Sequence, residues 1–448
     1  MLTFLNLIIF TLQIILLIKA ILVLKKNALD FGALFIIIYI VFYVPVVYDM
    51  YFDWQLFSYV YKIVGQYNVF ASKTTITYFN FITTLIMLSF EIGYSLKRKN
   101  KKVNVDLCKP TNYVSVNYYI IQCLCFTIWL VIMVNLLSRY NGDLIMFFTP
   151  SSKDVYGSYY EKYISFLLPI IMLTLKRLKV YHFNNKKIDK TTVFYVLLVL
   201  ASSVPSGQRR EIINQILYIS LLFIVLPKYS IIDYFKGYKN KQKNQIQTKV
   251  LRLGLFIAAL VPFFWYGRVW FNQIQRGASN ITPPWEVRGV FEVLFGSSST
   301  GFPTIIALNN YYETIASGLP YFRNVIYLIT SPIPSAIYSE KLAALTEEVQ
   351  NMSNAGSNLS LFYITDMYLT FGPVSIFVSF LVGYILSVMY NRSLHSIYMK
   401  HKVLALIALS QIVLLYKNGV TEFVIKMTLY LFLMIISINL IFPTKKSK

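Results

Sequence analysis

Two adjacent arginines lie in a short polar segment between apolar stretches near the middle of the chain. Residues 205–211 read Pro-Ser-Gly-Gln-Arg-Arg-Glu, in which the first three residues favour a turn and Ser206 can cap the helix that follows. A helix N-terminus presents free backbone N–H groups and the positive end of the helix dipole. Arg209 and Arg210 are unfavourable there unless an anion binds between them, so the segment, including Gln208, predicts a phosphate or diphosphate site. The alternative is that both arginines anchor to lipid headgroups.

A second polar segment, 268–276, follows an apolar stretch and reads Arg-Val-Trp-Phe-Asn-Gln-Ile-Gln-Arg. If this segment is helical, its tryptophan, phenylalanine and isoleucine lie on one face and its polar residues on the other. The polar residues are Arg268, Asn272, Gln275 and Arg276. Amides and arginines together suit sugar hydroxyls and phosphates, and Arg288 adds positive charge farther along the chain. The alternative is an ordinary helix at the membrane interface.

Asp366 and Glu91 lie within apolar stretches, where ionisable groups indicate function. Asp366 lies near the predicted outer end of its stretch, where it can deprotonate a hydroxyl or pair with one of the arginines. A purely structural ion pair is the alternative. Glu91 lies near the basic end of another stretch, and we expect it to contact Lys97 and Arg98.

The composition of the chain predicts an integral membrane protein. Of its 448 residues, 56% are hydrophobic and only 14% are charged, and the mean hydropathy is +0.57. Soluble domains are usually about a quarter charged. The net charge of +23 would indicate nucleic-acid binding in a soluble protein. Here the basic residues gather in short loops between apolar stretches, as cytoplasmic loops do, so we expect membrane lipids and no nucleic acid as partners.

About eleven apolar stretches, within a range of ten to thirteen, are candidates to cross a bilayer. They lie at 3–24, 31–48, 74–96, 113–137, 160–175, 191–204, 212–226, 250–266, 363–389, 403–416 and 423–442. The sixth, seventh and tenth are short and must extend into their flanks or cross a thinned region of the bilayer. The predicted fold class is an all-α polytopic membrane protein, with a single integral membrane domain over residues 1–448.

The distribution of charge predicts the orientation of these stretches. Basic residues follow the odd-numbered stretches, and the loops after the even-numbered ones are near neutral. This alternation places the N-terminus outside and the C-terminus in the cytoplasm. The largest outer loop then spans residues 267–362 and is rich in aromatic residues. Loops of this length are usually functional or disordered, and the aromatic content favours interfacial or re-entrant helices.

The chain lacks the sequence patterns of metal and cofactor sites. No CxxC motif, HExxH motif or phosphate-binding loop is present. The three cysteines are Cys108, Cys123 and Cys125, and the three histidines are His182, His395 and His401. All the histidines fall in predicted cytoplasmic loops. We therefore expect no metal and no cofactor, and the energy for any group transfer must come with the substrate.

These segments resemble the oligosaccharide repeat-unit polymerases, the Wzy family of O-antigen and capsule synthesis. The resemblance covers most of the chain. It depends on the many spans, on Ser-Gly-Gln-Arg-Arg at 206–210 between two mid-chain helices, and on a large outer loop that opens with arginines. The loop closes on Thr-Asp-Met-Tyr-Leu-Thr-Phe-Gly at 365–372, which is similar to the stretch after the large loop in the family.

The resemblance implies a GT-C-like glycosyltransferase that needs no metal. Such an enzyme joins undecaprenyl-diphosphate-linked oligosaccharide repeat units on the outer face of the bacterial plasma membrane, in the synthesis of O-antigen, capsule or exopolysaccharide. The acceptor hydroxyl attacks the anomeric carbon and the lipid diphosphate leaves, so fixed arginines are the main need of the chemistry. A protein that regulates chain length is a further partner that the resemblance allows.

The resemblance also assigns roles to residues of this chain. The essential arginines of the family match Arg209 or Arg210, and Arg268, Arg276 or Arg288. The candidates for a carboxylate base are Asp366, Glu211 and Glu292. The residues expected to be catalytic are Arg209, Arg210, Arg276 and Asp366. The residues expected to bind substrate are Gln208, Arg268, Asn272, Gln275, Arg288 and Tyr368.

Other classes of membrane protein stay open. A lipid-linked oligosaccharide flippase or another transporter would carry cationic residues within its helices around a central cavity, often with repeat symmetry. An O-antigen ligase or a membrane acyltransferase would be expected to carry a histidine on the outer face, and none is predicted there. A purely structural membrane protein gives no reason for a long aromatic outer loop with several arginines.

Overall fold

All regular elements that the computed structural model describes are helical. The structure describes residues 2–56, 72–98, 117–139, 141–142, 159–182, 190–203, 209–225, 362–396 and 398–442, with Arg252, Tyr266, Trp270, Gln273, Pro283, Ile326 and Thr330. The helices are α1 (Leu2–Lys26), α2 (Phe31–Phe52), α4 (Lys73–Ser95), α5 (Asn117–Ser138), α7 (Tyr159–His182), α8 (Lys190–Ser203), α9 (Arg209–Val225), α17 (Tyr363–Phe371), the 3₁₀ helix η5 (Gly372–Val374), α18 (Ser375–Leu394), α19 (Met399–Ser410) and α20 (Ile412–Ile441).

Six segments within the described ranges are long and apolar enough to cross a membrane. They are Leu2–Lys26, Phe31–Phe52, Lys73–Ser95, Asn117–Ser138, Tyr363–Leu394 and Phe423–Ile441. They correspond to the first four predicted stretches, the ninth and the eleventh. The prediction of a multi-pass helical membrane protein is therefore confirmed.

The remaining predicted stretches are matched less closely. The sixth, seventh and tenth correspond to shorter apolar helices at Lys190–Ser203, Glu211–Val225 and His401–Ser410. The fifth lies within α7, and in the eighth, 250–266, only Arg252 and Tyr266 are described. The number of eleven spans, the GT-C likeness and the single membrane domain stay predictions.

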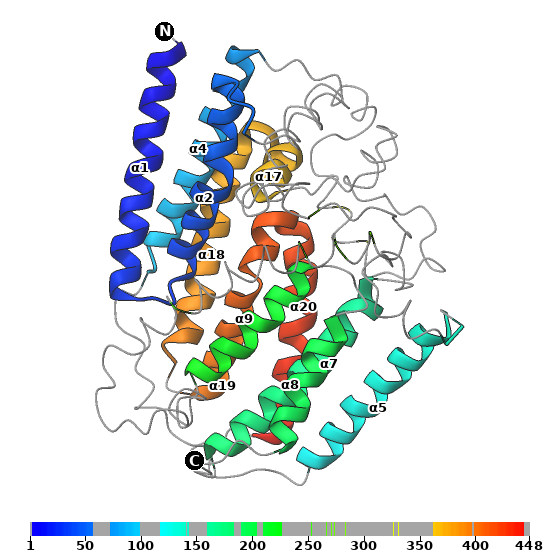
Figure 1. Cartoon of the computed structure of the whole chain (residues 1–448). Coiled ribbons are helices and arrows are strands. Elements are labelled where there is room, and N and C mark those ends of the chain that lie inside the picture. Colours follow the sequence, from blue (N-terminus) through cyan, green and yellow to red (C-terminus); the bar gives the residue numbers. More distant parts are fainter. Residues whose placement is uncertain are drawn as a thin grey trace. The chain divides into compact units, whose positions relative to one another are not determined.

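The described helices belong to two compact units. Unit 1 contains α1, α2, α4, α17, most of α18 and the first part of α20, up to Ile425. In this unit α1, α2 and α4 pack against one another and α17 contacts α4, as can be followed in Figure 1. Unit 2 contains α5, α7, α8, α9, α19 and α20 from Lys426 onward. There α7 packs against α5 and α8, and α9 packs against α8 and α19.

Buried polar side chains join α1 to α4 within unit 1. The Asn6 amide donates to the Thr77 hydroxyl at 2.6 Å. The Gln13 amide donates to Asn80 Oδ1 and to the Thr84 hydroxyl, both at 2.9 Å. Hydrogen bonds between membrane helices contribute about 0.6 kcal/mol each. These bonds therefore fix the register of α1, which buries few of its other side chains.

The helices α4 and α18 approach each other closely. The hydroxyls of Ser89 and Ser379 each donate to a backbone carbonyl of the other helix, at 2.6 and 2.9 Å. A Cβ atom added to Gly93 or to Gly383 would fall onto a backbone carbonyl of the opposite helix. Small residues at such a crossing let two membrane helices pack backbone to backbone.

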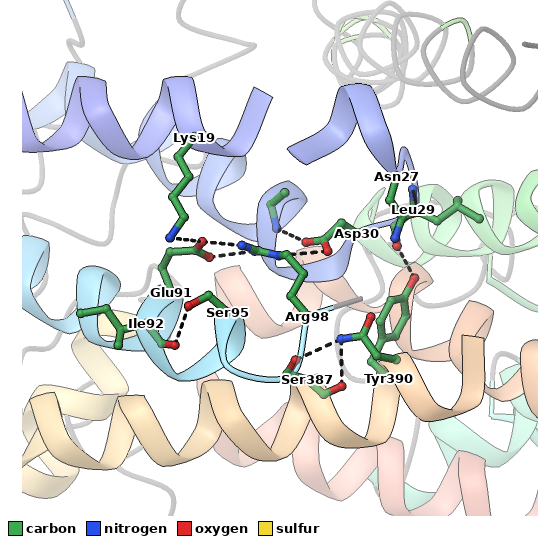
Figure 2. Close-up of polar contacts among 12 residues, drawn as sticks. Lys19, Asn27, Leu29, Asp30, Glu91, Ile92, Ser95, Arg98, Ser387 and Tyr390 are labelled. Carbon is green, nitrogen blue, oxygen red and sulfur yellow. Dashed lines mark hydrogen bonds and ion pairs between the residues drawn. The ribbon is translucent and has the colours of Figure 1, made fainter. Parts of the chain in front are cut away.

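A cluster of buried charges fixes one end of unit 1 (Figure 2). Arg98 donates to both carboxylate oxygens of Glu91, at 2.7 and 2.9 Å, and to Asp30 at 3.1 Å. Lys19 on α1 also contacts Glu91, at 3.0 Å. Asp30 in turn caps α2 by accepting the backbone N–H of Ala33 at 2.8 Å. The expected contact between Glu91 and Arg98 is thus confirmed, and the cluster ties the α1–α2 turn to the end of α4.

The charges of this cluster support one another. Burial raises the pKa of the Asp30 carboxyl, and the Arg98 guanidinium opposes that change. Burial alone would lower the pKa of Arg98, but Glu91 and Asp30 outweigh it and hold that pKa above its ordinary value. Arg98 is therefore charged at any physiological pH and holds the two acidic groups together.

Candidate functional site

The helix α9 begins at the arginine pair that the sequence singled out. Its first residue is Arg209, so Arg209 and Arg210 occupy the first turn of a helix, as predicted from the turn-forming residues before them. The structure describes their backbone but not their side chains. Gln208 and the rest of the preceding turn lie outside the described residues.

The buried face of α9 is polar over its first three turns. Glu211, Asn214, Gln215 and Tyr218 are each 2% exposed or less. Their spacing of three, four and seven residues from Glu211 places them on one side of the helix. Such a face is unusual in an apolar helix, because buried polar groups are costly unless they find partners.

At the N-terminal end of this polar face, Glu211 forms a buried ion pair within unit 2. Lys426 Nζ on α20 donates to Glu211 Oε2 at 2.7 Å, and each of the two side chains is 1% exposed. The rings of Tyr163, Tyr430 and Phe166 surround the ammonium group at 5.2, 5.4 and 6.0 Å from their centroids. Ring faces attract a cation, so the ammonium group is held from several sides.

Further contacts continue along the same face of α9. The Asn214 amide donates to Gln411 Oε1 at 3.4 Å, and the Gln411 amide donates to the Ser410 hydroxyl at 3.1 Å. One turn deeper, the hydroxyls of Tyr218 and Thr174 are hydrogen-bonded. Polar contacts thus connect α9 to α7 and to the end of α19.

Asp366 lies in unit 1, on the short helix α17, and is 2% exposed. Its Oδ2 accepts the backbone N–H of Val420 at 2.8 Å, and its Oδ1 accepts the Thr370 hydroxyl at 3.2 Å. Val420 directly follows Gly419, where α20 is interrupted by non-helical backbone angles, φ 81° and ψ −177°. Asp366 therefore caps the second segment of α20, as an N-cap residue of that segment would.

Gly419 is required by this arrangement for two reasons. Its backbone angles lie in a region that is open almost only to glycine. A Cβ atom at this position would lie 2.5 Å from Asp366 Oδ2. The interruption of α20 and the position of the carboxylate therefore depend on each other.

Gly419→Ala is expected to lower the free energy of unfolding by about 2 kcal/mol through backbone strain, with crowding at Asp366 adding to this. Unfolding of the purified protein by titration with sodium dodecyl sulfate in mixed micelles measures the change. Gly142→Ala is the matched control, because Gly142 has a φ of 78° but no heavy atom within 4 Å of an added Cβ. Equal effects of the two substitutions would contradict the crowding at Asp366.

The other candidate residues are placed only in part. Tyr368 is half-buried on α17, two residues from Asp366, and its ring packs edge-on against Phe79 at 5.7 Å. Arg268, Asn272, Gln275, Arg276 and Arg288 lie outside the described residues, as does Glu292. Within the predicted outer loop 267–362, the residues Trp270, Gln273, Ile326 and Thr330 have helical backbone, and Trp270 is 54% exposed. The interfacial or re-entrant helices stay a prediction.

Lys426 was not among the residues predicted to have a function. It lies inside the apolar stretch 423–442, where a charged residue is itself a signal of function. Its partner Glu211 was a candidate base. In the structure, the Glu211 carboxylate forms an ion pair with Lys426. The catalytic roles of Asp366 and Glu211 stay predictions.

The helices and these buried polar contacts define a multi-pass helical membrane protein with a polar, charged helix start at α9. No family model, curated protein or solved structure matches the chain. Its function is therefore inferred from its own residues.

Proposed function

We propose that the protein is a polymerase that joins undecaprenyl-diphosphate-linked oligosaccharide repeat units at the outer face of the bacterial plasma membrane. The product is an O-antigen, a capsule or an exopolysaccharide. One observation carries the proposal: α9 begins with Arg209 and Arg210. The positive end of the helix dipole and two arginines together suit the diphosphate of such a donor.

The chemistry is the transfer of a glycosyl chain. The acceptor hydroxyl forms a new bond to the anomeric carbon of the donor, and the bond from that carbon to the diphosphate oxygen breaks. The leaving lipid diphosphate takes the electron pair, and the arginines stabilise its growing charge. The hydroxyl proton passes to a base. Asp366 and Glu211 have partners in the fold, so the base stays open between them, Glu292 and solvent.

The remaining features of the proposal come from the sequence and from its resemblance to the repeat-unit polymerases. They are about eleven spans in a GT-C-like arrangement, an N-terminus outside, a C-terminus in the cytoplasm and no cofactor. The residues that we propose to bind substrate, beside Arg209 and Arg210, are Gln208, Arg268, Asn272, Gln275, Arg288 and Tyr368, with Arg276 as a further catalytic arginine. A chain-length regulator is a proposed partner, beside the lipid-linked substrate and the membrane lipids.

A lipid-linked oligosaccharide flippase is the second candidate. Two observations favour it: the interruptions of α20 at Gly419 and between α17 and α18 at Gly372, and the burial of Lys426. Interrupted helices and buried charges line the substrate sites of many transporters. Arginines at a helix start suit the polymerase better, because they can act on a leaving group at the membrane surface.

Deletion of the gene tests the proposal. The null strain is expected to display single repeat units with no ladder of longer chains on a gel of the surface glycan. Wild type should restore the ladder, whereas Arg209→Ala, Arg210→Ala and Arg276→Ala should not, because loss of one such donor slows comparable reactions by about 10²–10³-fold.

Arg392→Ala is the control for this series, because Arg392 is exposed in the last turn of α18 and is predicted to face the cytoplasm. This variant should restore the ladder. Protein levels are compared by immunoblot for every variant. Lipid-linked repeat units that accumulate on the cytoplasmic side of the null strain would identify a flippase and contradict the polymerase.

A further inference from the structure

We infer that Lys426 is a positioning residue. It holds the first turn of α9, which contains Arg209 and Arg210, in the orientation that binds the diphosphate. This inference rests on the proposed role of Arg209 and Arg210. Lys426 itself is fully buried and contacts Glu211, so it would act on substrate through α9 and not directly.

The ion pair of Glu211 fixes the first turn of α9. Glu211 directly follows the arginine pair in the first turn of α9. The ends of helices fray more readily than their centres. Because the 2.7 Å ion pair fixes the Glu211 side chain, it also fixes the rotation of the turn about the helix axis. The directions in which the two neighbouring residues leave the backbone are then fixed as well.

Burial keeps both side chains of the ion pair in place. Both side chains are 1% exposed, and a buried charge that loses its partner is strongly unfavourable. Neither group can therefore swing toward solvent at low cost. The rings of Tyr163 and Tyr430, from α7 and α20, hold the ammonium group at 5.2 and 5.4 Å. The anchor of α9 is thus itself fixed by two other helices.

The positive charge of Lys426 also matters for binding of an anion at the start of α9. An acidic residue in the first turn is favourable for the helix dipole, but beside an anion site it repels the anion. Lys426 offsets the charge of Glu211, so both arginine charges act on a bound diphosphate. An apolar residue in place of Glu211 would avoid the repulsion too, but it would not give the helix start a directional contact.

Binding of inorganic pyrophosphate to the full-length protein in lipid nanodiscs tests the inference, together with the thermal unfolding midpoint. Lys426→Met is expected to weaken binding about tenfold or more, because small misplacements of binding groups have large effects, and to lower the midpoint. Lys426→Arg keeps the charge and the contact, and should bind within about twofold of wild type. Lys19→Met is the matched control, since Lys19 pairs with Glu91 but is 46% exposed, and should bind as wild type does.

The double variant Glu211→Leu/Lys426→Met separates positioning from stability. Apolar replacement of a buried ion pair commonly preserves stability, so its unfolding midpoint should return toward that of wild type. Its pyrophosphate affinity should nevertheless stay about tenfold weak. If the affinity returns with the midpoint, Lys426 has only a structural role and the inference is overturned.

Failure of the proposed function gives a different result. In that case wild type does not bind pyrophosphate, or Arg209→Ala and Arg210→Ala bind it as tightly as wild type does. Binding that depends on the arginines but not on the Lys426–Glu211 pair overturns the inference alone.

Discussion

Arg98→Ala is expected to lower the free energy of unfolding by about 3–5 kcal/mol, as breaking a buried ion pair does in other proteins. The Arg98 side chain is 5% exposed, and its partners Asp30 and Glu91 are 0% and 4% exposed. Without the guanidinium, the buried Asp30 carboxylate loses its ion-pair partner and Glu91 keeps only the half-exposed Lys19, so the two carboxylates repel each other. Unfolding by titration with sodium dodecyl sulfate measures the loss.

Lys19→Ala is the matched control for this prediction. Lys19 contacts the same Glu91 oxygen at 3.0 Å, but its side chain is 46% exposed. Exposed ion pairs contribute about 0–1 kcal/mol, so the control should change the unfolding curve little. Arg98→Lys should recover only part of the stability, because a lysine cannot bridge two carboxylates with the planar geometry of a guanidinium. A loss below about 1 kcal/mol for Arg98→Ala would show that solvent screens the cluster in the folded protein.

The helices of this protein follow from its apolar stretches, and their interruptions do not. A long apolar run predicts a span because its length matches the bilayer. The tenth predicted stretch, 403–416, reads as one run, but the structure divides it at Gln411 between α19 and α20. The ninth is likewise divided at Gly372. Hydropathy contains no signal for such breaks, because the residues on either side stay apolar.

Of the buried polar contacts, the local one was also predictable from sequence. Glu91 and Arg98 are seven residues apart, so their contact follows from the end of one helix. The contact between Asp366 and Val420 joins residues 54 positions apart, and the one between Glu211 and Lys426 joins residues 215 positions apart. Such pairs depend on how the helices pack. A charged residue in an apolar stretch shows that some partner exists, and the fold decides which.

Asp366→Ala is expected to lower the free energy of unfolding by about 3 kcal/mol, and Asp366→Asn by less than about 1 kcal/mol. Alanine removes the cap of the second segment of α20 and leaves the partly buried N–H of Val420 without its 2.8 Å acceptor, and both losses are unfavourable. Asparagine is as good a helix cap as aspartate, and its amide oxygen can accept the same bond. Titration with sodium dodecyl sulfate compares the three proteins.

The same pair of variants separates the two roles of Asp366 in function. A general base contributes about 10²–10⁴-fold to a rate, and asparagine cannot act as one. Both carboxylate oxygens accept hydrogen bonds within the fold, so with a purely structural role for Asp366 the Asp366→Asn variant keeps the glycan ladder, whereas Asp366→Ala loses it along with stability. A normal level of folded Asp366→Asn with no ladder would instead identify Asp366 as the base. The broken helix α20 would then serve to orient a catalytic carboxylate, and Gly419→Ala should reduce the ladder in proportion to the displacement of that carboxylate.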